Sequence, residues 1–60
     1  MNRAQIEEEV QEGKHDSSYW EFVVDVGAGE IAMHEEAIFA AIEGGRYFEA
    51  FCDYLEGETT

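Results

Sequence analysis

The chain has 60 residues, enough for one small domain, and carries 15 Asp and Glu against 3 Lys and Arg, a net charge of −12. A domain of this size buries only about 60% of the surface that its unfolded form exposes, so we expect marginal stability. The single cysteine, Cys52, excludes an internal disulfide and favours a reducing, cytoplasmic location. Short apolar runs and an acidic N-terminal segment exclude a membrane span and a secretory signal.

The excess of carboxylates argues against direct binding of nucleic acid or anionic lipid, because a negative surface repels both. High net charge with few aliphatic residues is also typical of disordered chains. The eight aromatic residues, in two periodic clusters, favour a single folded acidic domain over residues 1–60. We identify no internal repeat and no linker between domains in the sequence.

Residues 2–13 are predicted to form the first helix. Asn2 is a suitable N-cap, and Gly13 is a suitable stop signal. Ile6 and Val10, four residues apart, supply most of a narrow apolar edge. We therefore expect this helix to pack loosely on the rest of the domain.

Residues 19–26 resemble a β-strand, because β-branched and aromatic residues dominate them. Alternation along a strand points successive side chains to opposite faces. The predicted buried face consists of Trp20, Phe22, Val24 and Val26, and the predicted exposed face of Tyr19, Glu21, Val23 and Asp25.

Residues 27–29 form a glycine turn, and two interpretations are open for the residues that follow. Residues 30–34 alternate and could return as a second strand, with Ile31 and Met33 facing the core. The same residues could instead begin a helix that runs to Glu43. A lone strand leaves backbone groups unpaired, which favours the hairpin.

The last third of the chain is predicted to be helical. A helix over residues 35–43 ends at Gly44 and Gly45, and another over residues 46–55 has a strong amphipathic pattern and ends at Gly57, before a tail over residues 58–60. The predicted fold class is therefore α+β: a small two-stranded antiparallel hairpin packed with two or three short helices.

Catalytic and metal-binding motifs are weak in this sequence. His34-Glu35-Glu36 lacks the second histidine four residues on that a zinc-binding helix requires. Cys52 could use His15 or His34 as a base, but the neighbouring acids raise the pKa of its thiol. Residues 27–29 lack the lysine of a phosphate-binding loop. We expect no enzymatic activity, no metal and no cofactor.

The carboxylates themselves are the strongest functional signal. Residues four apart on a helix lie about 5–6 Å apart, close to the phosphate spacing along one nucleic-acid strand. The three basic residues leave most carboxylates without a partner, and their repulsion lowers stability unless the field serves a purpose. The predicted partner-binding surface consists of Glu8 and Glu12, Glu21 and Asp25, and Glu49, Asp53 and Glu56.

In size and charge, the whole chain resembles the small acidic proteins with which phages inhibit host defences, including the nucleic-acid-mimicking anti-CRISPR proteins. The resemblance implies a non-catalytic inhibitor that binds the basic DNA- or RNA-binding surface of a host complex such as a CRISPR effector. If the chain is phage-encoded, it would act in the host bacterial cytoplasm. The resemblance does not identify a target, and no residue is carried over by position.

Two other functions are compatible with the sequence. Phe39, Tyr19, Tyr47 and Tyr54 do not all fit inside so small a core, so one or two of them could form an exposed aromatic patch. Such a patch is typical of a small accessory or antitoxin-like module that binds a protein partner, or of a homodimer rather than a monomer. Alternatively, the acidity serves solubility alone.

Overall fold

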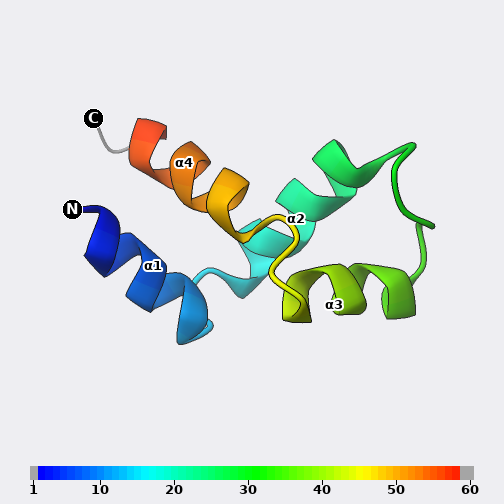
Figure 1. Ribbon diagram of the computed structural model, residues 1–60, viewed down its shortest axis with the longest axis horizontal. Helices are drawn as coiled ribbons and strands as arrows, with labels where there is room; N and C mark the ends of the chain where they lie inside the picture. The colour runs from blue at the N-terminus through cyan, green and yellow to red at the C-terminus, as the bar shows by residue number, and fades with distance from the viewer. Residues whose placement is uncertain (1, 59–60) are drawn as a thin grey trace.

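Four α-helices form the part of the chain that the computed structural model describes, residues 2–58 (Figure 1). Helix α1 packs on α4 at one end of the molecule, and α2 packs on α3 at the other. The start of α1 and the end of α4 lie at the same end (Figure 1). The bounds are Arg3–Gln11 for α1, Asp16–Gly27 for α2, Glu35–Glu43 for α3 and Phe48–Glu58 for α4.

The fold is all-α, so the predicted α+β class is wrong. Residues 2–58 contain no β-strand, and the predicted strand over residues 19–26 lies within α2. The preference of aromatic and β-branched residues for strands largely reflects packing, and tertiary contacts override it here. Tyr19, Val23 and Gly27, which follow one another at a spacing of four, form the buried face of α2.

This change of period also reverses the predicted faces. Tyr19 and Val23 were predicted to be exposed, but they are 4% and 0% exposed. Val26, predicted to be buried, is 42% exposed. A strand repeats every 2 residues and a helix every 3.6, so the same apolar residues serve different faces. Trp20, Phe22 and Val24 are partly buried and pack against the core.

The connection over residues 28–34 is neither the second strand nor the start of a long helix. Its only pairing of strand type is an isolated bridge between Ala28 and Ile31. The amides of Glu30 and Ile31 donate to the carbonyl of Gly27 at 2.8 and 3.0 Å and close the end of α2. Both interpretations of this segment are therefore wrong, although Ile31 does pack against the core.

The other three helices agree closely with the sequence. Asn2 is the N-cap of α1, and its Oδ1 accepts a hydrogen bond from the amide of Gln5 at 2.8 Å. Helix α3 has the predicted bounds. Helix α4 begins two residues later than predicted and continues through Gly57 to Glu58. Of the predicted tail, residues 59–60 lie outside the described part.

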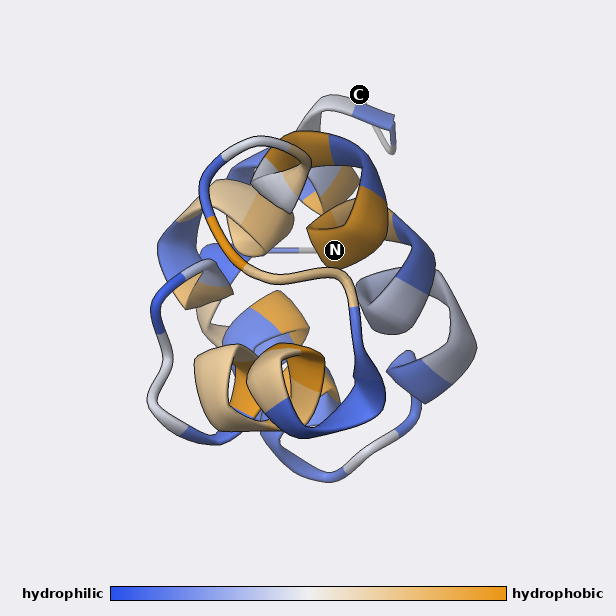
Figure 2. Cartoon of the chain, turned by 90° about the vertical axis from the view of Figure 1, so that its right-hand side faces the viewer, coloured by the Kyte–Doolittle hydropathy of each residue, from blue (hydrophilic) through white to orange (hydrophobic). Residues whose placement is uncertain are grey.

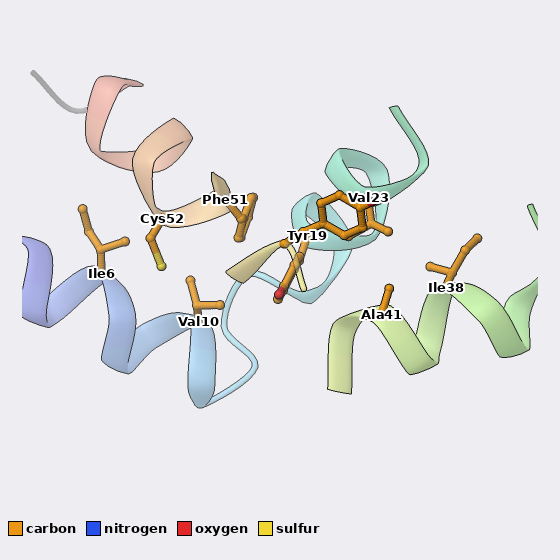
Figure 3. Packing of buried hydrophobic residues seen from close by; sticks show 9 residues of the cluster. Ile6, Val10, Tyr19, Val23, Ile38, Ala41, Phe51 and Cys52 are labelled. Atoms are coloured by element: carbon orange, nitrogen blue, oxygen red, sulfur yellow. The ribbon is translucent and has the colours of Figure 1, made fainter. Parts of the chain in front are cut away.

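Apolar side chains from all four helices, together with Tyr47 in the turn between α3 and α4, pack into a compact core (Figure 3). At its centre, Phe51 is fully buried and stacks on Tyr19, with ring centroids 4.7 Å apart and planes 10° apart. The narrow apolar edge of α1 is fully used, since Ile6 is 0% exposed and Val10 is 6% exposed. The buried apolar side chains of the core are those of Ile6, Val10, Tyr19, Val23, Ile38, Ala41, Tyr47, Phe51 and Cys52.

The two halves of the molecule repeat the same helix–turn–helix unit. Helices α1 and α3 begin at residues 3 and 35, and α2 and α4 begin at 16 and 48, so each start recurs 32 residues later. Each turn contains one glycine with a left-handed backbone, Gly13 with φ of +83° and Gly45 with φ of +73°. The backbone therefore contains an internal repeat, although we identified none in the sequence.

The two turns also share one hydrogen-bond pattern. The amide of Lys14 donates to the carbonyl of Glu9 at 3.1 Å, and the amide of Gly13 to that of Val10 at 3.2 Å. The amides of Arg46 and Gly45 donate in the same way, at 3.1 and 3.2 Å, to the carbonyls of residues 41 and 42. Each pair is a Schellman cap, which requires a left-handed residue and therefore favours glycine.

An approximate twofold axis relates the two halves. Exchanging them converts the α1·α4 contact into the α2·α3 contact, as Figure 1 shows. The stacked rings of Tyr19 and Phe51 occupy equivalent positions, as do those of Phe22 and Tyr54, whose centroids lie 5.4 Å apart. Equivalent residues that contact each other are the mark of a twofold interface.

No helix within residues 2–58 is long and apolar enough to cross a membrane.

Candidate functional site

All seven acidic residues of the predicted partner-binding surface are exposed and lie on helices or at a helix end. They do not form one continuous row. Asp53 and Glu56 surround Arg3, Glu12 and Glu49 line a groove, and the pair on α2 lies near Tyr54. The seven are Glu8 and Glu12, Glu21 and Asp25, and Glu49, Asp53 and Glu56.

Arg3 ties α1 to α4 through a cluster of hydrogen bonds. Its Nε donates to Glu7 at 2.9 Å, and its Nη1 donates to Asp53 and, at 3.4 Å, to Glu56. Its Nη2 donates to the carbonyl of Glu49 at 3.4 Å. The bonds to Asp53 and Glu7 raise the pKa of Arg3 further above its usual range. Asp53 and Glu56 therefore have a structural role as well as a charge.

Glu21 and Asp25 are neighbours on a helix rather than on a strand. Together with Phe22 and Val26 they line a shallow hollow of about 350 Å³ that Tyr54 of α4 closes on one side. A hydrogen bond from Tyr54 to Glu58 raises the pKa of the Tyr54 phenol, and the charges of Glu21 and Asp25 raise it further. Both carboxylates thus face α4 across the twofold axis.

A larger open groove of about 840 Å³ lies between the two turns, those over residues 12–15 and 44–47, where the C-terminal ends of α1 and α3 meet. Equivalent residues of the two halves line it in pairs, among them Val10 with Ile42 and Gly13 with Gly45. Its charged residues are four carboxylates and one guanidinium: Glu12, Asp16, Glu43, Glu49 and Arg46.

Two helices end at this groove and two others, α2 and α4, begin there, so its negative potential comes from its carboxylates rather than from the helix dipoles. Neither α1 nor α3 has a basic residue in its last turn. The C-terminal end of a helix carries a partial negative charge from its aligned peptide dipoles, and the N-terminal end carries a partial positive charge. The guanidinium of Arg46 lies over the ring of Tyr47, 5.5 Å from its centroid. The groove is therefore suited to a cation.

One buried polar atom faces this groove. Tyr19 lines it and is 4% exposed, and within residues 2–58 its hydroxyl has no hydrogen-bond partner. Figure 3 shows this hydroxyl pointing to the side on which Val10 and Ala41 lie. Burial raises the pKa of the Tyr19 phenol, so the group keeps its proton at neutral pH.

The residues considered for catalysis have structural roles. Cys52 is 0% exposed, and burial raises the pKa of its thiol. The Nδ1 of His34 accepts a hydrogen bond from the amide of Ala37 at 3.3 Å and caps α3. His15 Nε2 lies 2.9 Å from Glu9 Oε1. Among the described residues, no three His, Cys, Asp or Glu side chains form a group that could hold a metal ion.

The end of the molecule formed by α2 and α3 exposes three large apolar side chains among its carboxylates. Phe39, Met33 and Val26 are 52%, 46% and 42% exposed. The ring of Phe39 meets Trp20 edge to face, with centroids 5.0 Å apart. Figure 2, which faces this end, shows a hydrophobic stretch of the connecting segment crossing in front of the helices. Of the four aromatic residues considered for exposure, Phe39 and Tyr54 are exposed and Tyr19 and Tyr47 are buried.

Sequence reasoning found Glu12 and Glu49 of the groove but missed Asp16, Glu43 and Tyr19. The signal that could have found them is the 32-residue repeat, which makes the two helix ends equivalent. No known protein family, curated protein or solved structure matches the chain.

Proposed function

We propose that this chain is a non-catalytic binding protein that occupies the basic nucleic-acid-binding surface of a partner, such as a CRISPR effector, in place of DNA or RNA. The observation that carries the proposal is a net charge of −12 held by four packed helices. Duplex DNA presents one charge per about 1.7 Å of its axis, so a surface that binds it is rich in Lys and Arg. A compact polyanion competes for that surface.

Internal ion pairs leave most of this charge uncompensated. Arg3 and Lys14 pair with four carboxylates, those of Glu7, Glu12, Asp53 and Glu56. The third basic residue, Arg46, lies over an aromatic ring. Fixed helices hold most of the remaining carboxylates, so binding does not require ordering a flexible polyanion, which would cost conformational entropy.

The test is displacement of a fluorescent target duplex from a purified CRISPR effector complex. We expect competitive displacement that weakens steeply with added salt, because counterion release governs binding to such surfaces. The triple variant Glu8→Gln/Glu12→Gln/Glu49→Gln should weaken competition by roughly tenfold or more. These residues are chosen because Asp53 and Glu56 also hold Arg3.

The control is Glu35→Gln/Glu36→Gln, which removes exposed charge from the start of α3, outside the predicted surface. It should change competition much less than the triple variant. Equal displacement at low and high salt, or equal effects of the two variants, would contradict mimicry of nucleic acid.

A second candidate function rests on the exposed apolar residues of the α2·α3 end. Phe39, Met33 and Val26 form a surface suited to a protein partner, because large apolar side chains anchor such interfaces. If this surface is the binding site, Phe39→Ala/Met33→Ala abolishes displacement and the glutamine variants leave it intact.

A further inference from the structure

The groove between the two turns has an excess of negative charge that favours a bound cation. Its charged residues are four carboxylates against the single guanidinium of Arg46. The C-terminal ends of α1 and α3, both without a basic residue in their last turns, meet there. The N-terminal ends of α2 and α4 line the groove as well, so the helix dipoles offset one another and the carboxylates set its negative potential. An anionic ligand is excluded by the same charges.

The hydroxyl of Tyr19 is a second, independent observation. Buried polar groups in folded proteins are nearly always hydrogen-bonded, and an unpaired one is costly. Within the described residues this hydroxyl has no partner, although Tyr19 is 4% exposed and lines the groove. Its twofold equivalent is Phe51, which fills the matching space without a hydroxyl. The hydroxyl is thus not needed for packing, and a ligand in the groove would give it a partner.

The walls of the groove narrow the choice of cation. Ile42 offers partly exposed apolar surface to an aliphatic stem, and Phe48 lines the groove and is also partly exposed. A planar guanidinium stacks on aromatic rings, is weakly hydrated and donates several hydrogen bonds at once, whereas an ammonium is compact and strongly hydrated. These properties favour arginine over lysine.

We propose that the groove binds an arginine side chain of the basic partner, with the Tyr19 hydroxyl accepting a hydrogen bond from the guanidinium and the surrounding carboxylates neutralising its charge. This inference rests on the proposed function for the source of the arginine. It assigns one anchoring contact within the broader acidic surface.

The test uses N-acetyl-arginine methylamide as the probe and N-acetyl-citrulline methylamide, which has nearly the same shape but no charge, as its control. In an NMR titration of the full chain, the arginine probe should cause saturable shifts at the amides of Gly13, Gly44 and Gly45, and the citrulline probe should not. Glu12→Gln/Glu43→Gln should weaken binding by roughly tenfold. Equal shifts with both probes, or arginine shifts as large at Glu35 and Glu36 as in the groove, would overturn the proposal.

Tyr19→Phe tests the hydroxyl directly. The variant should fold with no loss of stability, because no hydrogen bond within the protein is removed, and bind the arginine probe roughly three- to tenfold more weakly. The control Tyr54→Phe removes a hydroxyl on the opposite hollow and should leave probe affinity unchanged. Unchanged probe affinity in Tyr19→Phe would overturn the role of the hydroxyl.

The probe needs no macromolecular partner, so its outcome separates from that of the displacement assay. Salt-sensitive displacement of DNA without probe binding overturns the groove assignment and leaves the proposed function intact. Probe binding without displacement supports the groove assignment and overturns the proposed function.

Discussion

The two ends of the molecule have the same backbone arrangement but join their helices through different contacts. At the α1·α4 end, Arg3 joins α1 to α4 through ion pairs to Asp53 and Glu56, and it also pairs with Glu7 of its own helix. At the α2·α3 end, the rings of Trp20 and Phe39 join the helices. Glu7 and Phe39 occupy equivalent positions 32 residues apart.

This difference shows which residues determine the fold. The features common to both halves are the glycine caps and the buried positions, such as Ile6 with Ile38 and Tyr19 with Phe51. Outer positions of the two helix contacts tolerate either a carboxylate or an aromatic ring. The shared positions therefore maintain the architecture, and the outer positions determine whether an ion pair or an aromatic pair joins the helices at each end.

The largest effect is expected at the centre of the twofold arrangement. Phe51 is fully buried and stacks on Tyr19, so Phe51→Ala should lower the free energy of unfolding by about 3–5 kcal/mol. A domain of this length has a total stability of roughly 3–9 kcal/mol, so the variant approaches global unfolding. Urea denaturation followed by circular dichroism measures the loss.

Phe51→Leu keeps this prediction measurable if the alanine variant does not fold, since it should cost less than about 1.5 kcal/mol. Tyr54→Ala is the matched control, because this ring belongs to the same aromatic group but is 46% exposed. Its effect should be much smaller. Similar losses in Phe51→Ala and Tyr54→Ala would mean that the buried ring of Phe51 contributes no more to the free energy of unfolding than the exposed ring of Tyr54.

The next effect concerns the two glycine caps. Gly13→Ala and Gly45→Ala force alanine into a left-handed conformation and should each cost about 1–2 kcal/mol. Gly13→Ala should cost more, since a Cβ at this position would lie 3.3 Å from the Asp16 carboxylate, whereas the nearest contact at Gly45 is 3.9 Å. Thermal unfolding of both variants tests whether the two halves need their caps equally.

Gly57→Ala provides the control for the glycine variants. This residue lies within α4, and a Cβ there meets nothing within 4 Å. Alanine should therefore raise stability by up to about 0.5–1 kcal/mol through helix propensity. Stabilisation by all three substitutions would show that neither cap requires its left-handed backbone.

The sequence predicts α1, α3 and most of α4 because apolar residues three and four apart recur in each, and because Asn2 and the glycine turns mark ends of α1 and α3. It does not predict α2, because residues 19–26 are apolar at six of eight positions and fit a period of two as well as one of 3.6. Burial of Tyr19, Val23 and Gly27, which are four residues apart, decides for the helix. Which residues are buried depends in turn on how the rest of the chain packs against this segment.

The duplication and the groove could be predicted only in part. Between residues 2–26 and 34–58 the only identical pairs at this spacing are Ile6 with Ile38 and Gly13 with Gly45, so the repeat is weak in the sequence. Conservative pairs such as Lys14 with Arg46 would support it once the spacing is known. The unpaired hydroxyl of Tyr19 depends on the three-dimensional surroundings, and no local pattern predicts it.

The contrast between the two ends can be sharpened with salt. Phe39→Ala removes an edge-to-face pair with Trp20 and should cost about 0.5–1.5 kcal/mol at any salt concentration. Arg3→Met removes the ion pairs of the other end, and its loss should shrink as salt rises, because exposed charges are screened. Melting temperatures at low and high salt distinguish the two, and equal salt dependence would contradict the assignment of ion pairs to one end and of an aromatic pair to the other.

The smallest effect concerns the equivalent residues His15 and Tyr47 of the two turns, each of which contacts a carboxylate. Tyr47 donates to Glu30 at 2.7 Å, and this hydrogen bond raises the pKa of its phenol above the ordinary value of 10.0. The folded state therefore holds this proton longer than the unfolded state, and its contribution to stability is complete below pH 10 and is lost as pH rises further. Tyr47→Phe should make the decline in urea midpoint between pH 9 and 11 shallower, whereas His15→Phe removes no phenol and should leave the slope unchanged. An identical alkaline slope in Tyr47→Phe and the unmodified chain would show that the hydrogen bond to Glu30 does not contribute.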